Sequence, residues 1–175
     1  GSNQAENSKD NFKEFMIYDG QGRWQTAKHL DLITSKLQEV SEDTVKGISH
    51  RLIIALPPRH GKSETVSKKF PAWHLGRNPG HEIVLSSYSA DLAYDHSRIA
   101  RDTLLTHSEL FNINIAKDSA AVGRWGIEGH RGGLFAVGVG GPITGRGAHI
   151  GIIDDPFKNA EEANSETIRE KVWNW

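Results

Sequence analysis

The sequence predicts an α/β domain with a mainly parallel β-sheet flanked by helices. Short apolar runs without polar alternation occur at 51–56, at 82–88 (EIVLSSY) and at 149–154 (HIGIID). Such runs are typical of strands buried on both faces of a parallel sheet. Segments with helical spacing lie between them, and strands that alternate with helices in this way favour the parallel α/β class.

The helices are expected from apolar residues that recur at three- and four-residue steps. One expected helix, 89–107, has Ser89 as its N-cap, and another, 63–75, contains Pro71, which should end or kink it. The glycine-rich stretch 123–147 predicts a hairpin and a loop. The remaining expected elements are helices at 24–40 and 164–175 and hairpin strands at roughly 124–128 and 133–139.

Residues 1–22 are mostly polar and are expected to be a flexible, only partly ordered lead-in, with Gly1-Ser2 typical of a tag remnant. The remaining residues, 23–175, are long enough for one globular domain with a sizeable core.

Composition excludes several classes of function. With no cysteine, the 175-residue chain has neither disulfides nor thiolate metal sites, and its nine histidines lack zinc-ligand spacing. The net charge of −1 means that any contact with nucleic acid must come from a local patch. No apolar run is long enough to span a membrane, so no membrane partner is expected.

The first motif with chemical meaning is LPPRHGKSE, which follows the apolar run 51–56. Gly61-Lys62-Ser63 at the junction of a strand and a helix is typical of a phosphate-binding loop, although Leu56 occupies the place of its usual leading glycine. In such a loop Lys62 would face the β- and γ-phosphates, and the Ser63 hydroxyl would bind Mg²⁺. The alternative is that Gly61 is a turn residue and Lys62 a solvated side chain.

The second motif is IGIIDDP, where an apolar strand ends on two carboxylates. Asp154 is placed to bind Mg²⁺ beside a phosphate loop. Asp155 follows at the position where hydrolysing enzymes usually have a glutamate that polarises the attacking water. The alternative for this pair is a helix N-cap followed by a solvated turn residue.

Four segments together resemble the ATPase domain of the large terminase subunit of tailed bacteriophages and prophages. They are PPRHGKSE, SYSADLA, GVGGPITGRGAHIGIIDDPFKNAEEA and ETIREKVWNW, and the resemblance covers residues 24–175. It implies a P-loop NTPase of the additional-strand (ASCE, RecA-like) type. It also implies that the chain stops after the Walker B helix, before the family's coupling segment and nuclease domain.

The resemblance assigns the catalytic and metal-binding roles residue by residue. Lys62 and Ser63 match the Walker A lysine and the Mg²⁺-binding hydroxyl, and Asp154 matches the Walker B aspartate. Asp155 occupies the catalytic-acid position, and the alternative carboxylates for that role are Glu161 and Glu162.

Further residues are assigned to the nucleotide in the same way. Arg59 is the arginine of the Walker A loop and is expected to be catalytic as well as nucleotide-binding. Arg146, also expected to be catalytic, resembles an arginine that this family presents to a neighbouring subunit's ATP; a loop ion pair or a DNA contact is the alternative for Arg146. Gln25 and Trp24 resemble the adenine-contacting segment, with His29 as a competitor. The nucleotide-binding set is Arg59, His60, Gly61, Lys62, Ser63, Glu64, Gln25 and Trp24.

The function implied is Mg²⁺-dependent ATP hydrolysis that drives double-stranded DNA into a capsid. The implied cofactors are ATP and Mg²⁺, and the implied partners are DNA, the portal protein, the small terminase subunit and further copies of the chain in a ring. The work would take place at the procapsid in the cytoplasm of the bacterial host. The alternatives are another DNA translocase or helicase-like P-loop ATPase, or a nucleotide-binding prophage remnant that does not hydrolyse ATP.

Overall fold

The computed structural model of the chain describes residues 2–20, 28–48, 50–54, 68–87, 89–138 and 148–154. Their six strands form one sheet in the order β1-β6-β2-β5-β4-β3. The strands are β1 (His50–Ile54), β2 (Glu82–Ser87), β3 (Ile115–Ala121), β4 (Arg124–Ile127), β5 (Gly133–Gly138) and β6 (Ile150–Asp154).

The sheet is parallel in one part and antiparallel in the other. β1, β6, β2 and β5 run parallel to one another, which confirms the predicted parallel sheet. β4 pairs antiparallel with β5 as the expected hairpin, and β3 extends the sheet by a further antiparallel pairing with β4. β3 was not expected from the sequence.

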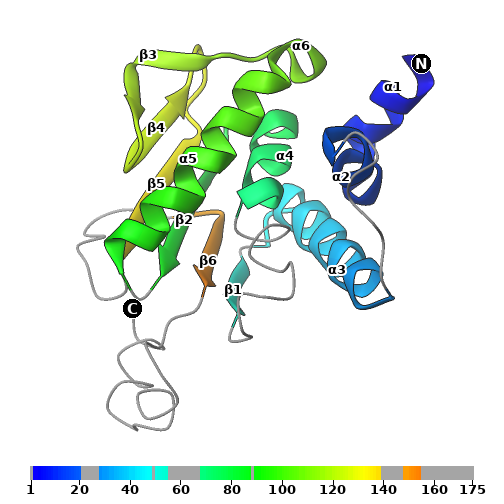
Figure 1. Ribbon diagram of the computed structural model, residues 1–175, viewed down its shortest axis with the longest axis horizontal. Helices are drawn as coiled ribbons and strands as arrows, with labels where there is room; N and C mark the ends of the chain where they lie inside the picture. The colour runs from blue at the N-terminus through cyan, green and yellow to red at the C-terminus, as the bar shows by residue number, and fades with distance from the viewer. Residues whose placement is uncertain are drawn as a thin grey trace, which may run out of the picture.

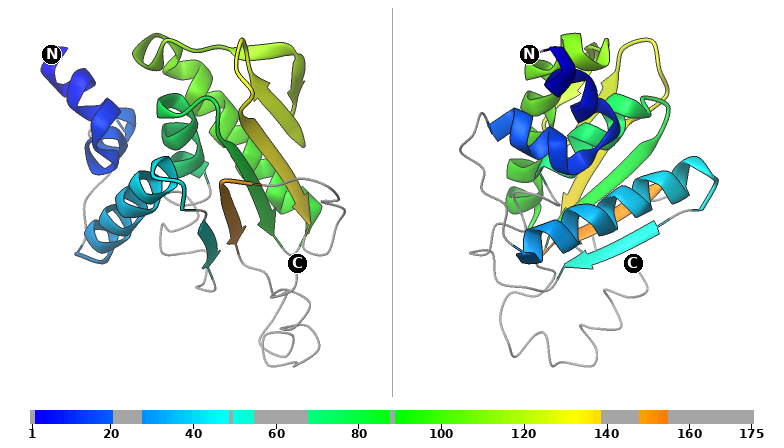
Figure 2. Two further views of the ribbon diagram at one scale, coloured as in Figure 1. Left: turned by 180° about the vertical axis from the view of Figure 1, so that it is seen from behind. Right: turned by 90° about the vertical axis from the view of Figure 1, so that its right-hand side faces the viewer.

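The helices gather on one side of the sheet and at one of its edges (Figures 1 and 2). α5 lies along β2 and β5, with α4 beside it, while α1, α2 and α3 lie beyond α4. The helices are α1 (Ser2–Asp10), α2 (Phe12–Gly20), α3 (Lys28–Val45), α4 (Phe70–Arg77), α5 (Ala90–Thr106) and α6 (Ser108–Phe111).

Two predicted helix boundaries can be compared directly with the structure. Ser89 caps α5, because its Oγ accepts a hydrogen bond from the backbone N–H of Leu92, as predicted. α4 begins at Phe70 with Pro71 in its first turn, directly after π-helical geometry at residues 68–69, and the first part of the expected helix, 63–67, lies outside the described residues. A first-turn N–H has no partner within its helix, so proline is tolerated there.

The expectation of a flexible, partly ordered lead-in over 1–22 is wrong for the part that the structure describes. Residues 2–20 form α1 and α2, and Phe12 and Phe15 are fully buried. The Phe12 ring lies 5.3 Å from that of Trp73, whose Nε1 donates a hydrogen bond to the Ser8 carbonyl oxygen. These helices are therefore part of the core, and the polar composition of the segment concealed its single apolar face.

The additional-strand class stays a prediction. β1, which leads into the expected phosphate loop, pairs directly with β6, which ends at Asp154. The additional-strand class is named for a strand that separates these two, and the described part of the sheet has none between them. In the observed order β6 is the second strand from one edge, between the edge strand β1 and β2.

Candidate functional site

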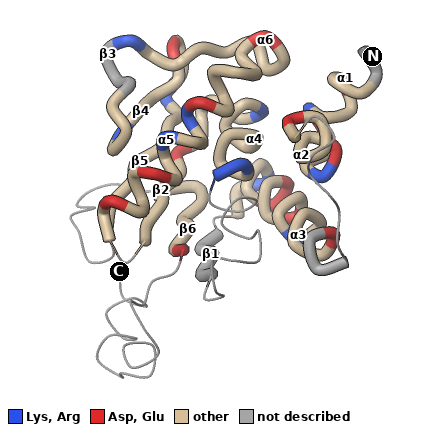
Figure 3. Tube along the Cα trace, viewed as in Figure 1, with Lys and Arg blue, Asp and Glu red and all other residues tan. Residues whose placement is uncertain are grey.

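The carboxyl ends of three parallel strands meet at one edge of the sheet. Asp154, the last residue of β6, pairs in register with Ile54 at the end of β1 and with Ser87 at the end of β2. Figure 3 shows the acidic end of β6, and in Figure 1 the β1 and β6 arrows point toward the same edge of the sheet. Ligands of open α/β sheets bind outside the carboxyl ends of the strands, so this edge is the candidate site.

The Asp154 side chain lies on the helix-covered face of the sheet. Alternate residues of a strand point to the same face, and Ile150 and Ile152 of β6 belong to the hydrophobic core. Asp154 continues that row and is only 1% exposed. A carboxylate buried this deeply requires a charged or hydrogen-bonding partner.

His96 of α5 provides one partner for this carboxylate. Its Nε2 lies 3.2 Å from Asp154 Oδ2, and His96 itself is 8% exposed. His96 belongs to the buried stripe of α5, which also contains Ala93, Ser97 and Ala100. The stripe places the imidazole between the helix and the end of β6.

Two further polar atoms are buried around Asp154. The Oγ of Ser87 and the Nδ1 of His96 are both buried and have no hydrogen-bond partner within the described part of the chain. Buried polar atoms usually have partners, and those left over point to a ligand, a water or a segment outside the described residues. The site thus has polar groups ready to accept further contacts.

Of the residues predicted for the site, Asp154 is the one whose side chain the structure describes. It occupies the predicted position at the end of a strand beside β1. The other predicted residues, together with the alternatives Glu161, Glu162 and His29, have side chains outside the described residues. They are Trp24, Gln25, Arg59, His60, Gly61, Lys62, Ser63, Glu64, Arg146 and Asp155.

Sequence reasoning missed His96. His96 does not have zinc-ligand spacing to another histidine, is not part of the phosphate-loop or adenine segments, and lies far from Asp154 in the sequence. A usable signal was present, because His96 is a polar residue at an i, i+3, i+4 core position of an amphipathic helix. Such a residue needs a polar partner on the surface against which the helix packs.

A cluster of three histidines, of which His74 is fully buried, lies at the opposite, amino-terminal end of β2 and β6. His74 Nε2 and His81 Nδ1 are 3.0 Å apart, and His74 Nδ1 lies 2.8 Å from the Ser41 hydroxyl. The ring of His149 stacks on His81 at 4.3 Å, and its Nδ1 accepts a hydrogen bond from the Glu82 N–H. Burial, with the neighbouring His81, lowers the pKa of His74 to about 3, and burial also lowers the pKa of His81.

An ion-pair network ties α2 to the start of α4 and to the end of α5. Asp19 accepts from Lys69 Nζ at 2.9 Å and from His107 Nε2 at 2.8 Å. Burial alone raises the pKa of the Asp19 carboxyl, but the hydrogen bonds from His107 and Lys69 outweigh it and hold that pKa below its usual range. Lys69 follows the predicted phosphate-loop segment in the sequence, so this network anchors the helix beyond that segment.

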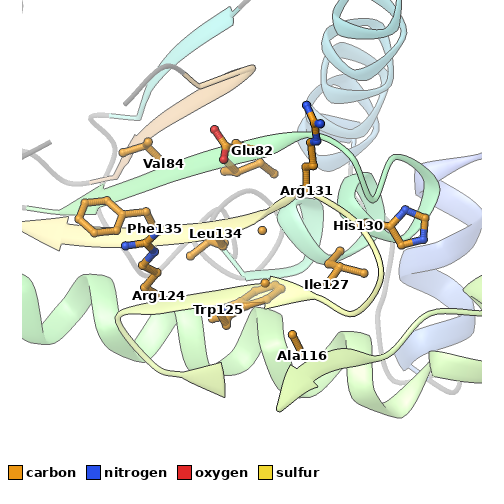
Figure 4. A pocket seen from close by; sticks show the side chains of 14 residues that line it. Glu82, Val84, Ala116, Arg124, Trp125, Ile127, His130, Arg131, Leu134 and Phe135 are labelled. Carbon is orange, nitrogen blue, oxygen red and sulfur yellow. The ribbon is translucent and has the colours of Figure 1, made fainter. Parts of the chain in front are cut away.

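A hollow of about 260 Å³ lies over β2, β4 and β5 (Figure 4). Arg124 and Phe135 lie at one end of it and His130 at the other. Asp154 and the other predicted site residues are not among the residues that line it. It is therefore separate from the candidate site.

Within the described ranges, no three His, Asp or Glu side chains are grouped so as to hold a metal ion. Among those same residues, none of the helices combines the length and the apolar character needed to cross a bilayer.

The fold and this strand edge define an α/β protein with a buried acidic residue at the carboxyl end of β6, a parallel strand paired on both sides. A family model described as "Terminase large subunit, T4likevirus-type, N-terminal" matches residues 53–175. The match spans more than half of the chain, from within β1 through β6, and the chain belongs to this family. Membership implies a role in viral DNA packaging. Neither a curated protein nor a solved structure matches the chain at a significant level.

Proposed function

We propose that this chain is the Mg²⁺-dependent ATPase domain of a large terminase subunit, and that its ATP hydrolysis moves double-stranded DNA into a capsid. The strand register supports this proposal most directly. β1, from which the chain runs on toward Gly61-Lys62-Ser63, ends beside Asp154 of β6. A phosphate loop and a metal-binding carboxylate must be neighbours to act on one nucleotide.

The described residues fit a magnesium ion. Mg²⁺ in phosphate sites is held by one or two carboxylates, with phosphates and waters completing its shell. The buried Asp154 supplies such a carboxylate at the end of β6, and Ser63 is the proposed second protein ligand. When bound, the ion would neutralise charge on the β- and γ-phosphate oxygens.

The other proposed roles belong to residues of the loops. Lys62 and Arg59 would bind phosphate oxygens, and the backbone N–H groups around Gly61 would add donors. Asp155 would orient the attacking water and accept its proton. Arg146 would reach the nucleotide of a neighbouring copy, so that full activity requires a ring.

Binding of a fluorescent ATP analogue in Mg²⁺ tests the nucleotide site. Lys62→Ala should abolish or strongly weaken binding, whereas the control Lys36→Ala, an exposed lysine on α3, should bind as the wild type does. If Lys62→Ala binds normally while its circular dichroism is unchanged, the nucleotide site is not at this loop.

Phosphate release tests the motor itself. Phosphate release should be slow in dilute protein, because few copies then have a neighbour to supply the arginine. An arginine supplied by a neighbour is worth about 10³–10⁵ in rate. A protein concentration series, with and without linear duplex DNA, separates a ring ATPase from a module that binds ATP without hydrolysing it. The aspartate at position 155, where a glutamate is usual, is the feature that favours a module that binds ATP without hydrolysing it.

The proposed partners follow from the family: double-stranded DNA, the portal protein and the small terminase subunit, at the procapsid in the host cytoplasm. With a net charge of −1, the chain has little overall attraction for DNA, so DNA affinity of the isolated chain should be weak and should fall with salt.

A further inference from the structure

The contact between His96 and Asp154 joins a helix to the proposed metal ligand. α5 crosses the face of the sheet along β2 and β5, and His96 faces the end of β6 from its second turn. Asp154 is 1% exposed and His96 is 8% exposed, so water competes little for the contact. A contact of 3.2 Å between buried groups fixes the orientation of both side chains.

Packing alone gives no reason for a histidine at this position. The other buried members of the stripe are Ala93, Ser97, Ala100, Thr103 and Leu104. They are either apolar or have hydroxyl groups with hydrogen-bond partners close by. Ser97, for example, accepts a hydrogen bond from Trp125 Nε1. Replacing a buried ion pair by apolar residues of similar volume is often neutral or stabilising, so stability alone does not explain the pair, and its effect on the carboxylate explains it better.

The histidine can donate to Asp154 through Nε2–H. Ligating carboxylates are generally held by a second hydrogen-bonded partner, which fixes the direction in which they face the metal. Ser87 Oγ lies in register with Asp154 and has no partner within the described residues, so the polar groups at this point exceed what the described fold uses.

We propose that His96 is a positioning residue, which holds the Asp154 carboxylate in the orientation that binds the Mg²⁺ of the Mg²⁺–ATP complex. The inference rests on the proposed function, because it requires Asp154 to be a metal ligand. His96 itself touches neither the nucleotide nor the ion. It acts through its bond to Asp154 Oδ2.

The test compares two buried histidines. His96→Leu removes the Nε2 contact to Asp154, and His74→Leu removes a buried imidazole at the other end of the sheet, where it contacts Ser41 and His81. The measured quantity is the Mg²⁺ concentration that gives half-maximal binding of a fluorescent ATP analogue. Affinity for the analogue in EDTA and thermal unfolding are measured alongside, to separate metal binding from folding.

His96→Leu should raise the half-maximal Mg²⁺ concentration about ten-fold, the lower end of the range for outer partners of metal ligands. Affinity in EDTA should be unchanged. His96→Gln, whose side-chain amide can donate in place of Nε2–H, should recover most of the loss. His74→Leu should lower stability without moving the Mg²⁺ midpoint.

A folded His96→Leu with an unchanged Mg²⁺ midpoint overturns the positioning role. So does His96→Gln that behaves no better than His96→Leu. If instead the wild type itself shows no Mg²⁺-dependent binding, or Asp154→Asn leaves that dependence intact, then the proposed function fails and the inference fails with it.

A measurement on the wild type does not depend on how the variants fold. With Mn²⁺ in place of Mg²⁺ and ATP present, the ring signals of His96 should broaden in the NMR spectrum well before those of His74. Equal broadening of the two histidines, in a sample that binds the nucleotide, places the ion away from Asp154 and overturns the proposal.

Discussion

The amino end of β6 lies beside three histidines that bond to neutral groups, whereas its carboxyl end carries a carboxylate in contact with His96. At the amino end, His74 contacts the Ser41 hydroxyl and His81, and His149 accepts from a backbone N–H. At the carboxyl end, Asp154 is buried with His96. One strand therefore joins two polar clusters, of which only the one at the carboxyl end contains a carboxylate.

Under the proposed function, the histidines at the amino end of β6 contribute to stability, whereas Asp154 at its carboxyl end serves the nucleotide site. In the cluster at the amino end, burial lowers the pKa of His74 to about 3 and also lowers the pKa of His81, so these two imidazoles suit a neutral state. The cluster packs at the end of the sheet, and its hydrogen bonds join residues of the described fold to one another. The carboxyl end keeps a carboxylate in the interior, where its desolvation lowers the free energy of unfolding, so a functional role explains it better than stability does.

The largest effect is expected from Asp154→Asn, which changes the charge at the carboxyl end with little change in size. The Mg²⁺ affinity of the nucleotide complex should fall at least ~100-fold, the upper end of the range for residues that only support a ligand. Isothermal titration with Mg²⁺ and an ATP analogue measures it. His149→Ala, at the amino end of the same strand, is the matched control and should retain wild-type Mg²⁺ affinity.

Asp155→Asn should leave ATP binding intact and lower turnover about 100-fold, the usual scale for loss of a general base. Phosphate release measures the turnover, and equilibrium binding of the ATP analogue is the control. Normal hydrolysis by this variant would move the base to Glu161 or Glu162.

As the pH falls, the free energy of unfolding should decrease through the histidines at the amino end before it decreases through Asp19. His74 keeps a pKa of about 3 when folded but returns to 6.5 when unfolded, so below pH 6.5 the unfolded chain binds the extra proton. The free energy of unfolding should therefore fall, by about 1.4 kcal/mol per pH unit from this residue, as the pH drops from 6.5 toward 3. His81 acts in the same direction, whereas the lowered pKa of Asp19 adds its loss only below about pH 3.8.

Urea unfolding at a series of pH values measures this slope. His74→Gln should unfold with a flatter dependence on pH between 6.5 and about 3. A variant as steep as the wild type would mean that His74 is protonated in the folded protein.

The smallest effect is expected from His149→Phe. The new ring can still stack on His81 but cannot accept the hydrogen bond of the Glu82 N–H, which should cost about 1 kcal/mol in free energy of unfolding. Chemical denaturation measures the loss. A change in Mg²⁺-dependent nucleotide binding would show that the two ends of β6 are coupled and would contradict their separation.

Local pattern predicted much of the fold because it depends on neighbours in the sequence. The unbroken apolar run at β2, the capping side chain of Ser89 and the hairpin β4–β5 are each determined within a few residues. The same holds for Asp154, whose place at the end of an apolar strand is visible in IGIIDDP.

Other features depend on contacts between distant segments. The burial of Phe12 and Phe15 against α4 and α6 turned a segment expected to be flexible into core, although their i, i+3 spacing on one face was visible in the sequence. β3 has a bulged pairing and weak strand character, so only its partner β4 makes it a strand.

The sequence by itself determined an α/β chain in which an apolar strand ends in a carboxylate, because strand and helix periodicity and turn chemistry are local. Only the tertiary structure decided that β1 lies directly beside β6, that three histidines close the amino end of the sheet, and that His96 reaches Asp154. These contacts follow from how α5 and α4 pack on the sheet. Packing is set by the shapes of many side chains at once, so no short stretch of sequence encodes it.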